Sequence, residues 1–210
     1  MNAPMNDAGE RAHLVAQALE LTRTEGKVVT RADLARATGS SRSKIDRSFP
    51  EEDMLFDGVA EAFYQPQIEV MEKVVDSDLP PRRKLYEFIA RRYLMLRDDF
   101  RRDPAGFRAL CEAGSDAAER VRGYVDLADH YLAMIVAEAQ GEGALPGLKI
   151  DEALSVINQM VLCYTMPDMI ALIDQRLSER KLARIVDTIF DGLSGRDGGA
   201  APVAGLRAAD

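Results

Sequence analysis

Histidine and cysteine are scarce in this sequence, which has only two of each among 210 residues. The cysteines, Cys111 and Cys163, form no C-x-x-C pair, and two histidines are too few for a metal-ligand cluster at the usual spacing. We therefore expect no metal site, and we interpret both cysteines as reduced, buried, small apolar residues. A redox pair formed across the fold is the alternative interpretation.

The motifs of common enzyme classes are also missing. The sequence has no glycine-rich phosphate-binding loop and no recognisable pair of nucleophile and base. Ordinary acid–base catalysis would moreover have few histidines to use. We expect no catalytic residue, no cofactor and no enzymatic activity.

Long apolar runs are absent too. No run approaches the roughly 18 residues of a membrane-spanning helix, and the N-terminal segment lacks the apolar core of a signal peptide. We expect a soluble, cytoplasmic protein without a membrane partner. The formal net charge of −8 argues against a protein that coats nucleic acid without sequence preference, because such binding needs many Lys and Arg contacts to phosphate. A small basic face on an acidic body is still compatible with this charge.

Apolar residues recur at helical spacing along most of the chain, and no segment alternates over the length of a strand. Pro66 and Pro167 fall inside such patterns and are expected to kink their helices. The fold class predicted is all-α, with a small N-terminal three-helix domain joined to a larger C-terminal helical bundle. The pattern predicts helices over about 10–25, 31–38, 41–48, 51–77, 82–100, 105–112, 116–140, 151–174 and 178–194.

The second and third predicted helices have the spacing of a helix-turn-helix. Thr30 and Asp33 form a T-x-x-D capping box, Gly39 permits a sharp turn, and Ser40 or Ser41 caps the next helix. The N-terminal residues of that helix would face base edges in the major groove, and flanking residues, with the first N–H groups of the 31–38 helix, would contact phosphates. The predicted DNA-binding residues are Lys27, Thr30, Arg31, Ser40, Ser41, Arg42, Ser43, Lys44 and Arg47.

Local charge favours this interpretation. Seven basic and three acidic residues lie between positions 23 and 47, a net charge of +4 on an acidic protein. The alternative is a solvated charged surface on a small three-helix unit.

The run TRADLARATGSSRSKIDRSFPEEDMLFDGVAEAF, residues 30–63, resembles the N-terminal domain of the TetR family of transcriptional regulators. The resemblance implies a homodimer that binds a palindromic operator and releases it when a small molecule enters the C-terminal body. Two positions depart from the family pattern. Asp46 stands where the family usually has a tyrosine, and Glu52 where it has a lysine, both for phosphate contact.

Acids at these positions would weaken DNA binding. A carboxylate about 4 Å from a phosphate costs about 1 kcal/mol in water and about 4 kcal/mol at an effective dielectric constant of 20. Each lost cationic phosphate contact also reduces the salt slope by about 0.9. A TetR-like protein with weakened or lost DNA binding, acting through protein–protein contacts, is therefore the alternative function.

The C-terminal segment is rich in aromatic residues and methionine. Most of these side chains are interpreted as core filler, but a bundle of this composition could also enclose an apolar effector pocket with a few phenolic hydroxyls. The predicted pocket residues are Phe88, Tyr93, Phe107, Tyr124, Tyr131, Met134, Met160 and Tyr164.

The apolar stripe of the last helix, with the excess apolar face of 151–174, suggests a two-helix dimer surface. The residues predicted for it are Ile157, Leu182, Ile185, Val186, Ile189 and Phe190. The domain division expected is a disordered N-terminus (1–9), a helix-turn-helix domain (10–50), a ligand-binding and dimerisation domain (51–195) and a disordered Gly/Ala-rich tail (196–210).

Overall fold

Residues 7–116, 118–193 and 195 are described by a computed structural model, and every regular element among them is helical. The all-α prediction is confirmed. The elements are α1 (Asp7–Glu25), α2 (Arg31–Thr38), α3 (Arg42–Ser48), α4 (Glu52–Val75), α5 (Pro81–Arg102), α6 (Pro104–Asp116), α7 (Ala118–Gly141), α8 (Ile150–Thr165), α9 (Pro167–Ile173), the 3₁₀ turn η1 (Asp174–Arg176) and α10 (Glu179–Gly192).

The ends of α2 and α3 follow the capping signals of the sequence. The Thr30 hydroxyl accepts a hydrogen bond from the Asp33 N–H at 3.2 Å, and the Asp33 carboxylate accepts one from the Thr30 N–H at 3.3 Å. Hydrogen bonds from the Thr30 side chain and backbone hold the pKa of Asp33 below its ordinary value. Gly39 closes α2 at a φ of 65°, a left-handed conformation that favours glycine. Ser41, rather than Ser40, then caps α3.

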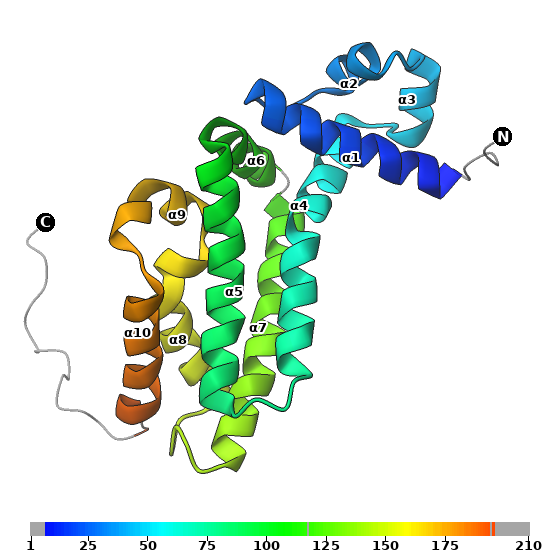
Figure 1. The fold of residues 1–210 in the computed structure, drawn as a ribbon. Coiled ribbons are helices and arrows are strands. Elements are labelled where there is room, and N and C mark those ends of the chain that lie inside the picture. The colour runs from blue at the N-terminus through cyan, green and yellow to red at the C-terminus, as the bar shows by residue number, and fades with distance from the viewer. Residues whose placement is uncertain (1–6, 117, 194, 196–210) are drawn as a thin grey trace, which may run out of the picture.

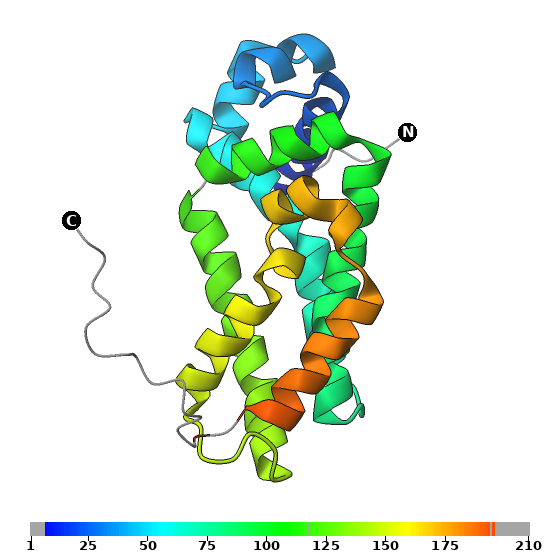
Figure 2. The ribbon, with the colours of Figure 1, turned by 90° about the vertical axis from the view of Figure 1, so that its left-hand side faces the viewer.

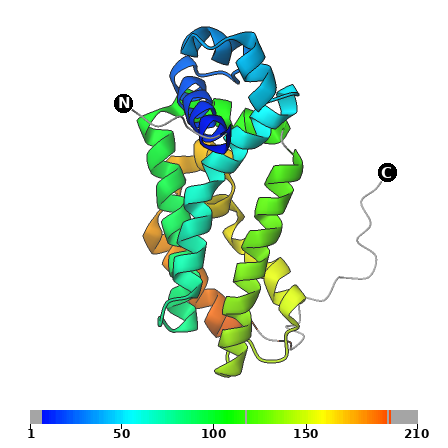
Figure 3. The ribbon, with the colours of Figure 1, turned by 90° about the vertical axis from the view of Figure 1, so that its right-hand side faces the viewer.

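The long helices α4, α5 and α7 run side by side as the body of the bundle, and α1–α3 stand at one end of it (Figure 1). The helices α8 and α10 share one face (Figure 2). On another side, α4 passes from the bundle to the underside of α1 (Figure 3). This helix packs against α1, α5, α6 and α7, so it connects the two parts of the molecule.

One hydrophobic cluster extends through both parts. It includes Leu34 and Ile45 of the N-terminal helices, Leu55 and Val59 at the start of α4, and bundle residues as far as Ile189. The hydrophobic core is therefore continuous across residue 50, where the three short N-terminal helices give way to the long helices of the bundle. The division into two domains at this residue stays a prediction.

The helix α6 fixes the N-terminal helices to the bundle by close packing against α1. A Cβ atom at Gly106 would lie 2.6 Å from the backbone carbonyl oxygen of Arg23, which no side chain could tolerate without backbone movement. Asp103 also accepts a hydrogen bond from the Gly106 N–H at 3.0 Å. The absence of a side chain at this position sets the distance between α1 and α6.

The bend predicted at Pro167 is confirmed, since the chain turns by 55° there. Pro167 also ends one helix and begins another, so the predicted helix 151–174 is two helices, α8 and α9. The helix α4 continues through Pro66, and the kink expected there stays a prediction. Pro66 lies on the exposed side of α4, where the carbonyl that loses its helical partner can bond to water. The helix α1 begins at Asp7, inside the predicted disordered stretch 1–9. The predicted tail 196–210 lies outside the described residues.

The predicted dimer surface is wrong for four of its six residues. Ile157, Leu182, Val186 and Ile189 are at most 2% exposed within the single chain. The apolar stripe of α10 packs against α5 and α8 of the same molecule. The sequence could not show this, because a stripe that faces the core and a stripe that faces a partner subunit have the same helical period. Ile185 and Phe190 are only partly buried.

No single helix of the described part is long and apolar enough to cross a membrane. One bent pair, α8 followed by the segment Pro167–Arg176, meets the criteria of length and composition.

Replacement of Leu182 by alanine should lower the free energy of unfolding by about 2–5 kcal/mol, because the side chain is fully buried in the core of one chain. Urea unfolding measures this loss, and Thr188→Ala, at an exposed position of α10, is the control. An effect on self-association alone, without loss of chain stability, would contradict the assignment of Leu182 to the core.

Candidate functional site

The N-terminal end of α3 presents a polar, exposed surface. Ser41, Arg42 and Ser43 are exposed, Ser40 and Lys44 are partly exposed, and the Arg42 side chain retains 93% of its accessible surface. The cap brings the Ser41 and Ser43 hydroxyls to 3.1 Å from one another. The four residues predicted to approach bases, Ser41 to Lys44, thus lie together with Ser40 at one end of the molecule, beyond the bundle (Figure 1).

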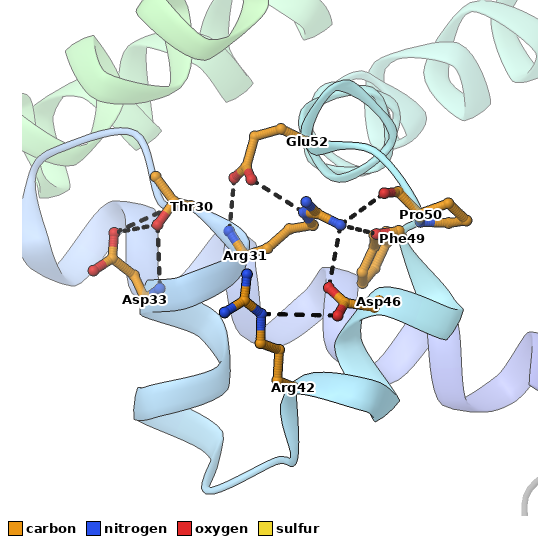
Figure 4. A network of polar contacts seen from close by, with 8 residues as sticks. All are labelled: Thr30, Arg31, Asp33, Arg42, Asp46, Phe49, Pro50 and Glu52. Carbon is orange, nitrogen blue, oxygen red and sulfur yellow. Dashed lines mark hydrogen bonds and ion pairs between the residues drawn. The ribbon is translucent and has the colours of Figure 1, made fainter.

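Arg31 lies at the centre of a polar network that joins α2, α3 and α4 (Figure 4). Its Nη1 donates to the Phe49 carbonyl at 2.7 Å, the Pro50 carbonyl at 2.8 Å and an Asp46 carboxylate oxygen at 3.3 Å. Its Nε donates to Glu52 Oε2 at 3.1 Å. The network ties the chain that leaves α3 to the start of α2, and so fixes the orientation of α3.

Glu52 occupies the N-terminal end of α2. Its Oε1 accepts a hydrogen bond from the Arg31 backbone N–H at 2.7 Å. Free N–H groups and the helix dipole make such a helix end favourable for an anion. Here the protein supplies the anion itself, so a phosphate could reach this N–H only by displacing Glu52. The sequence predicted phosphate contacts from Arg31 and from this helix end, and the structure gives both an internal acceptor.

The other residues predicted to contact DNA differ in how firmly they are held. Lys44, predicted to face bases, pairs with Glu10 of α1 at 2.7 Å, and Lys27, predicted to contact phosphate, pairs with Glu25 at 2.9 Å. The Thr30 hydroxyl donates to Asp33 at 2.8 Å as part of the cap. Exposed ion pairs of this kind contribute about 0–1 kcal/mol each and are screened by salt. Both lysines therefore stay available to a polyanion at low cost, unlike Arg31.

Two arginines of α3 are the most accessible bases of this surface. Arg42 lies 3.9 Å from Asp46, a distance too long for a strong contact. Arg47 is exposed, and no ion pair involves it among residues 7–116 and 118–193. Asp46, which the sequence placed opposite a phosphate, lies between Arg31 and Arg42 and neutralises part of their charge.

A second candidate site is a cavity of about 180 Å³ between α4, α5, α7, α8 and the start of α9. It opens to solvent on one side, where Val125, Leu162 and Met166 are 39–46% exposed. Phe88 and Tyr124 are the two predicted pocket residues that line it. Its walls are mainly apolar, with a few polar groups. The lining residues are Tyr64, Phe88, Arg92, Val121, Tyr124, Val125, Ala128, Asp129, Leu132, Asn158, Leu162, Thr165, Met166 and Pro167.

The other six predicted pocket residues lie elsewhere. Tyr93 and Tyr164 pack edge to face in the core with ring centroids 5.1 Å apart. Phe107 packs in the same manner against other core phenylalanines. The Tyr131 hydroxyl donates to Glu72 at the surface. Met134 is exposed and Met160 is partly buried against the core. Residue type alone could not separate these positions from the cavity wall.

Sequence reasoning missed Arg92, the most unusual residue of this cavity. Its side chain is only 4% exposed, and its Nε and Nη2 donate to the Tyr124 hydroxyl at 3.1 and 2.6 Å. That hydroxyl donates in turn to Gln67 Oε1 at 2.9 Å, and burial raises the pKa of Tyr124, which keeps the phenol protonated. The ring of Tyr124 stacks on Tyr64 at 4.2 Å.

Arg92 has no carboxylate partner within residues 7–112 and 121–193, whose side chains the structure describes. Its guanidinium lies over the rings of Phe88 and Tyr124 at 5.2 and 5.4 Å. Each such contact stabilises a cation by about 0.5–2 kcal/mol, whereas burial of an ion costs several kcal/mol. The cavity therefore holds a positive charge that the protein compensates only in part.

Comparisons with known proteins agree on one family. Residues 81–186, half of the chain, match the family model described as "Tetracyclin repressor-like, C-terminal domain". No curated protein matches the chain.

Solved structures share the fold. A TetR-family transcriptional regulator, PfmR from Thermus thermophilus, is 15% identical and superimposes with a TM-score of 0.57, over 86% of this chain and 98% of its own. A proposed transcriptional regulator from Pseudomonas aeruginosa PAO1 is 12% identical, with a TM-score of 0.68 over 90% and 91%. A proposed TetR-family regulator from Mesorhizobium loti MAFF303099 is 16% identical, with a TM-score of 0.62 over 90% and 96%. At these identities the likeness concerns the fold.

Replacement of Glu52 by alanine should lower the free energy of unfolding by about 1–2 kcal/mol, because the Arg31 N–H and Nε lose a charged acceptor. The neighbouring Glu51→Ala is the matched control, since Glu51 is exposed and its side chain makes no cap hydrogen bond. Chemical denaturation of both variants makes the comparison. Equal stabilities would mean that the Glu52 contact does not hold α2 and α4 together.

Proposed function

Because the chain belongs to the TetR family of transcriptional regulators, we propose that it is a ligand-responsive repressor. A homodimer binds a palindromic operator through α2 and α3 and releases it when a small effector enters the bundle. We expect the protein to be cytoplasmic, because a repressor must be in the compartment that contains its operator DNA. The proposed division assigns DNA binding to residues 10–50 and effector binding and dimerisation to residues 51–195.

The observation that supports DNA binding most directly is the exposed end of α3. Arg42 extends into solvent beside two serine hydroxyls and near Lys44, at the end of the molecule remote from the bundle. Arginine and lysine suit the O6 and N7 acceptors of guanine, and serine can donate or accept. A reading helix needs its N-terminal side chains free in this way.

The proposed dimer surface is the solvent side of α8 and α10. Val156 of α8 is 38% exposed, and Ile185 and Phe190 of α10 are partly exposed. These two helices lie on one face of the molecule (Figure 2). Such a surface can build a four-helix interface and place two reading helices about one turn of DNA, roughly 34 Å, apart.

The direct test of the function is selection of bound duplexes from a random pool, followed by a salt titration with the selected site. Enrichment of a palindrome, with affinity that falls as salt rises, supports the operator-binding dimer. Addition of a bound effector should then release the DNA.

Arg42→Ala should weaken binding to the selected operator about 5- to 100-fold and relax specificity at one position of each half-site. Arg36→Ala is the matched control, because it removes the same charge from an exposed side chain of α2 that is not expected to contact DNA. Fluorescence anisotropy with the operator and with single-base variants measures both effects. If both variants lose affinity equally and keep their specificity, Arg42 does not read a base.

Val156→Lys should shift the protein towards monomers, since a charge in the centre of the α8 and α10 surface would be buried without a partner. Met134→Lys is the control, because Met134 is comparably exposed but lies on α7. Analytical ultracentrifugation across a range of concentrations, with unfolding curves for each variant, makes the measurement. A wild-type protein that stays monomeric at micromolar concentration contradicts the homodimer.

A second candidate function is a TetR-like protein that has weakened or lost DNA binding and acts through protein contacts. The Arg31 network favours it, because Glu52 and Asp46 engage a base and a helix end that could otherwise meet phosphates. Absence of any enriched duplex in the selection, for a dimer that is folded, would support this candidate over the repressor.

A further inference from the structure

We infer that the cavity takes a small amphipathic monocarboxylate, whose anionic group binds Arg92 and whose apolar part fills the space between α7 and α8. This inference rests on the proposed function, in that it names the chemical class of the effector. It does not depend on which operator the protein binds.

The first step is a comparison of the buried cations. Lys84 and Arg92 are the two buried basic side chains of the described residues, at 6% and 4% exposure. Lys84 has an anionic partner, Glu138, at 2.8 Å, and also donates to the Val75 carbonyl. Arg97, which is less buried, has Asp174 at 2.8 Å. Arg92, the most buried, is paired with no carboxylate of residues 7–112 or 121–193, whose side chains the structure describes.

The second step concerns hydrogen-bond capacity. A guanidinium carries five N–H donors, and the two bonds to the Tyr124 hydroxyl use one on Nε and one on Nη2. The remaining three, which include both donors of Nη1, have no acceptor among the residues whose side chains the structure describes, 7–112 and 121–193. Since Arg92 lines the cavity, a carboxylate there can accept from them in the two-pronged geometry that arginine favours.

The third step is the fit of the rest of the cavity. Val121, Val125, Leu132 and Leu162 supply apolar wall, and the ring of Phe88 adds to it. The volume of about 180 Å³ is slightly larger than that of a closed cavity of about 150 Å³ that holds benzene, and this cavity is open to solvent beside Val125 and Leu162. The occupant is therefore of the size of benzoate or a short fatty acid, well below the size of most drug-like ligands.

A carboxylate of the protein also lines this cavity, and it limits where the anion can lie. Asp129 of α7 accepts a hydrogen bond from the Asn158 amide of α8 at 2.8 Å. It repels a ligand carboxylate and so favours a position at Arg92 for a ligand that has a single anionic group.

The test uses the full-length protein without DNA and a panel of benzoate, phenylacetate and hexanoate. Benzamide and hexanamide serve as neutral counterparts, and acetate as an anion with almost no apolar part. Isothermal titration calorimetry should show at least one carboxylate of the panel binding about 10- to 100-fold more tightly than its amide. Acetate should bind more weakly than that carboxylate, because it buries little apolar surface.

Arg92→Gln should remove the preference for the carboxylate and leave amide binding unchanged. Arg91→Gln is the matched control, since Arg91 is the exposed neighbour on α5 and pairs only with Glu87 among the described residues. Arg92→Lys, which keeps the charge, should retain part of the preference, and this rescue separates a role in binding from one in packing. Circular dichroism confirms that each variant is folded.

The inference is overturned if no carboxylate of the panel binds more tightly than its amide, if acetate binds as well as the larger acids, or if folded Arg92→Gln keeps the preference. These outcomes are separate from failure of the proposed function. A protein that selects an operator but ignores carboxylates contradicts only the ligand class. A protein that binds a carboxylate through Arg92 but enriches no duplex contradicts only the repressor.

Discussion

The helix α4 must bury its apolar residues in two different places, and this requirement holds the molecule together. Its first turns place Leu55 and Val59 against the N-terminal helices, and later turns place Met71 and Val74 inside the bundle. Because one rigid helix serves both cores, the position of α1–α3 relative to the bundle is set by packing rather than by a linker. The close approach of α1 and α6 at Gly106 adds a second fixed contact.

Polar groups of both candidate sites lie along this same helix. Glu52 at its first residue holds Arg31 and the end of α2, while Tyr64 and Gln67 near its middle contact the Tyr124 and Arg92 cluster of the cavity. A ligand that displaces or tightens this cluster therefore acts directly on the helix that positions the reading surface. Such an arrangement gives a physical basis for coupling between effector and DNA, provided that the two sites bias the same movement of α4.

The two buried or half-buried arginines illustrate how much context decides the role of a side chain. Arg31 was predicted to contact phosphate, and the structure surrounds it with two backbone carbonyls and two carboxylates of its own chain. Arg92 belongs to no motif and lies in an ordinary amphipathic pattern, yet it is the buried cation without a carboxylate partner among the described residues. In the sequence, each of them is simply a basic residue in a helical segment. The residues around it do not show which distant part of the chain it contacts.

The sequence by itself determined the helical elements, the caps of α2 and α3 and the helix-turn-helix, since period, capping and turn chemistry depend on neighbours along the chain. It also indicated the family, through the run 30–63. Only the tertiary structure decided that the stripe of α10 faces its own core, that Pro167 breaks a helix while Pro66 does not, and that Glu52 faces Arg31. It likewise placed the cavity at Phe88 and Tyr124 and away from the other aromatic residues predicted to line it. These outcomes depend on how each helix is rotated about its axis and on which distant helix it meets, and a local pattern specifies neither.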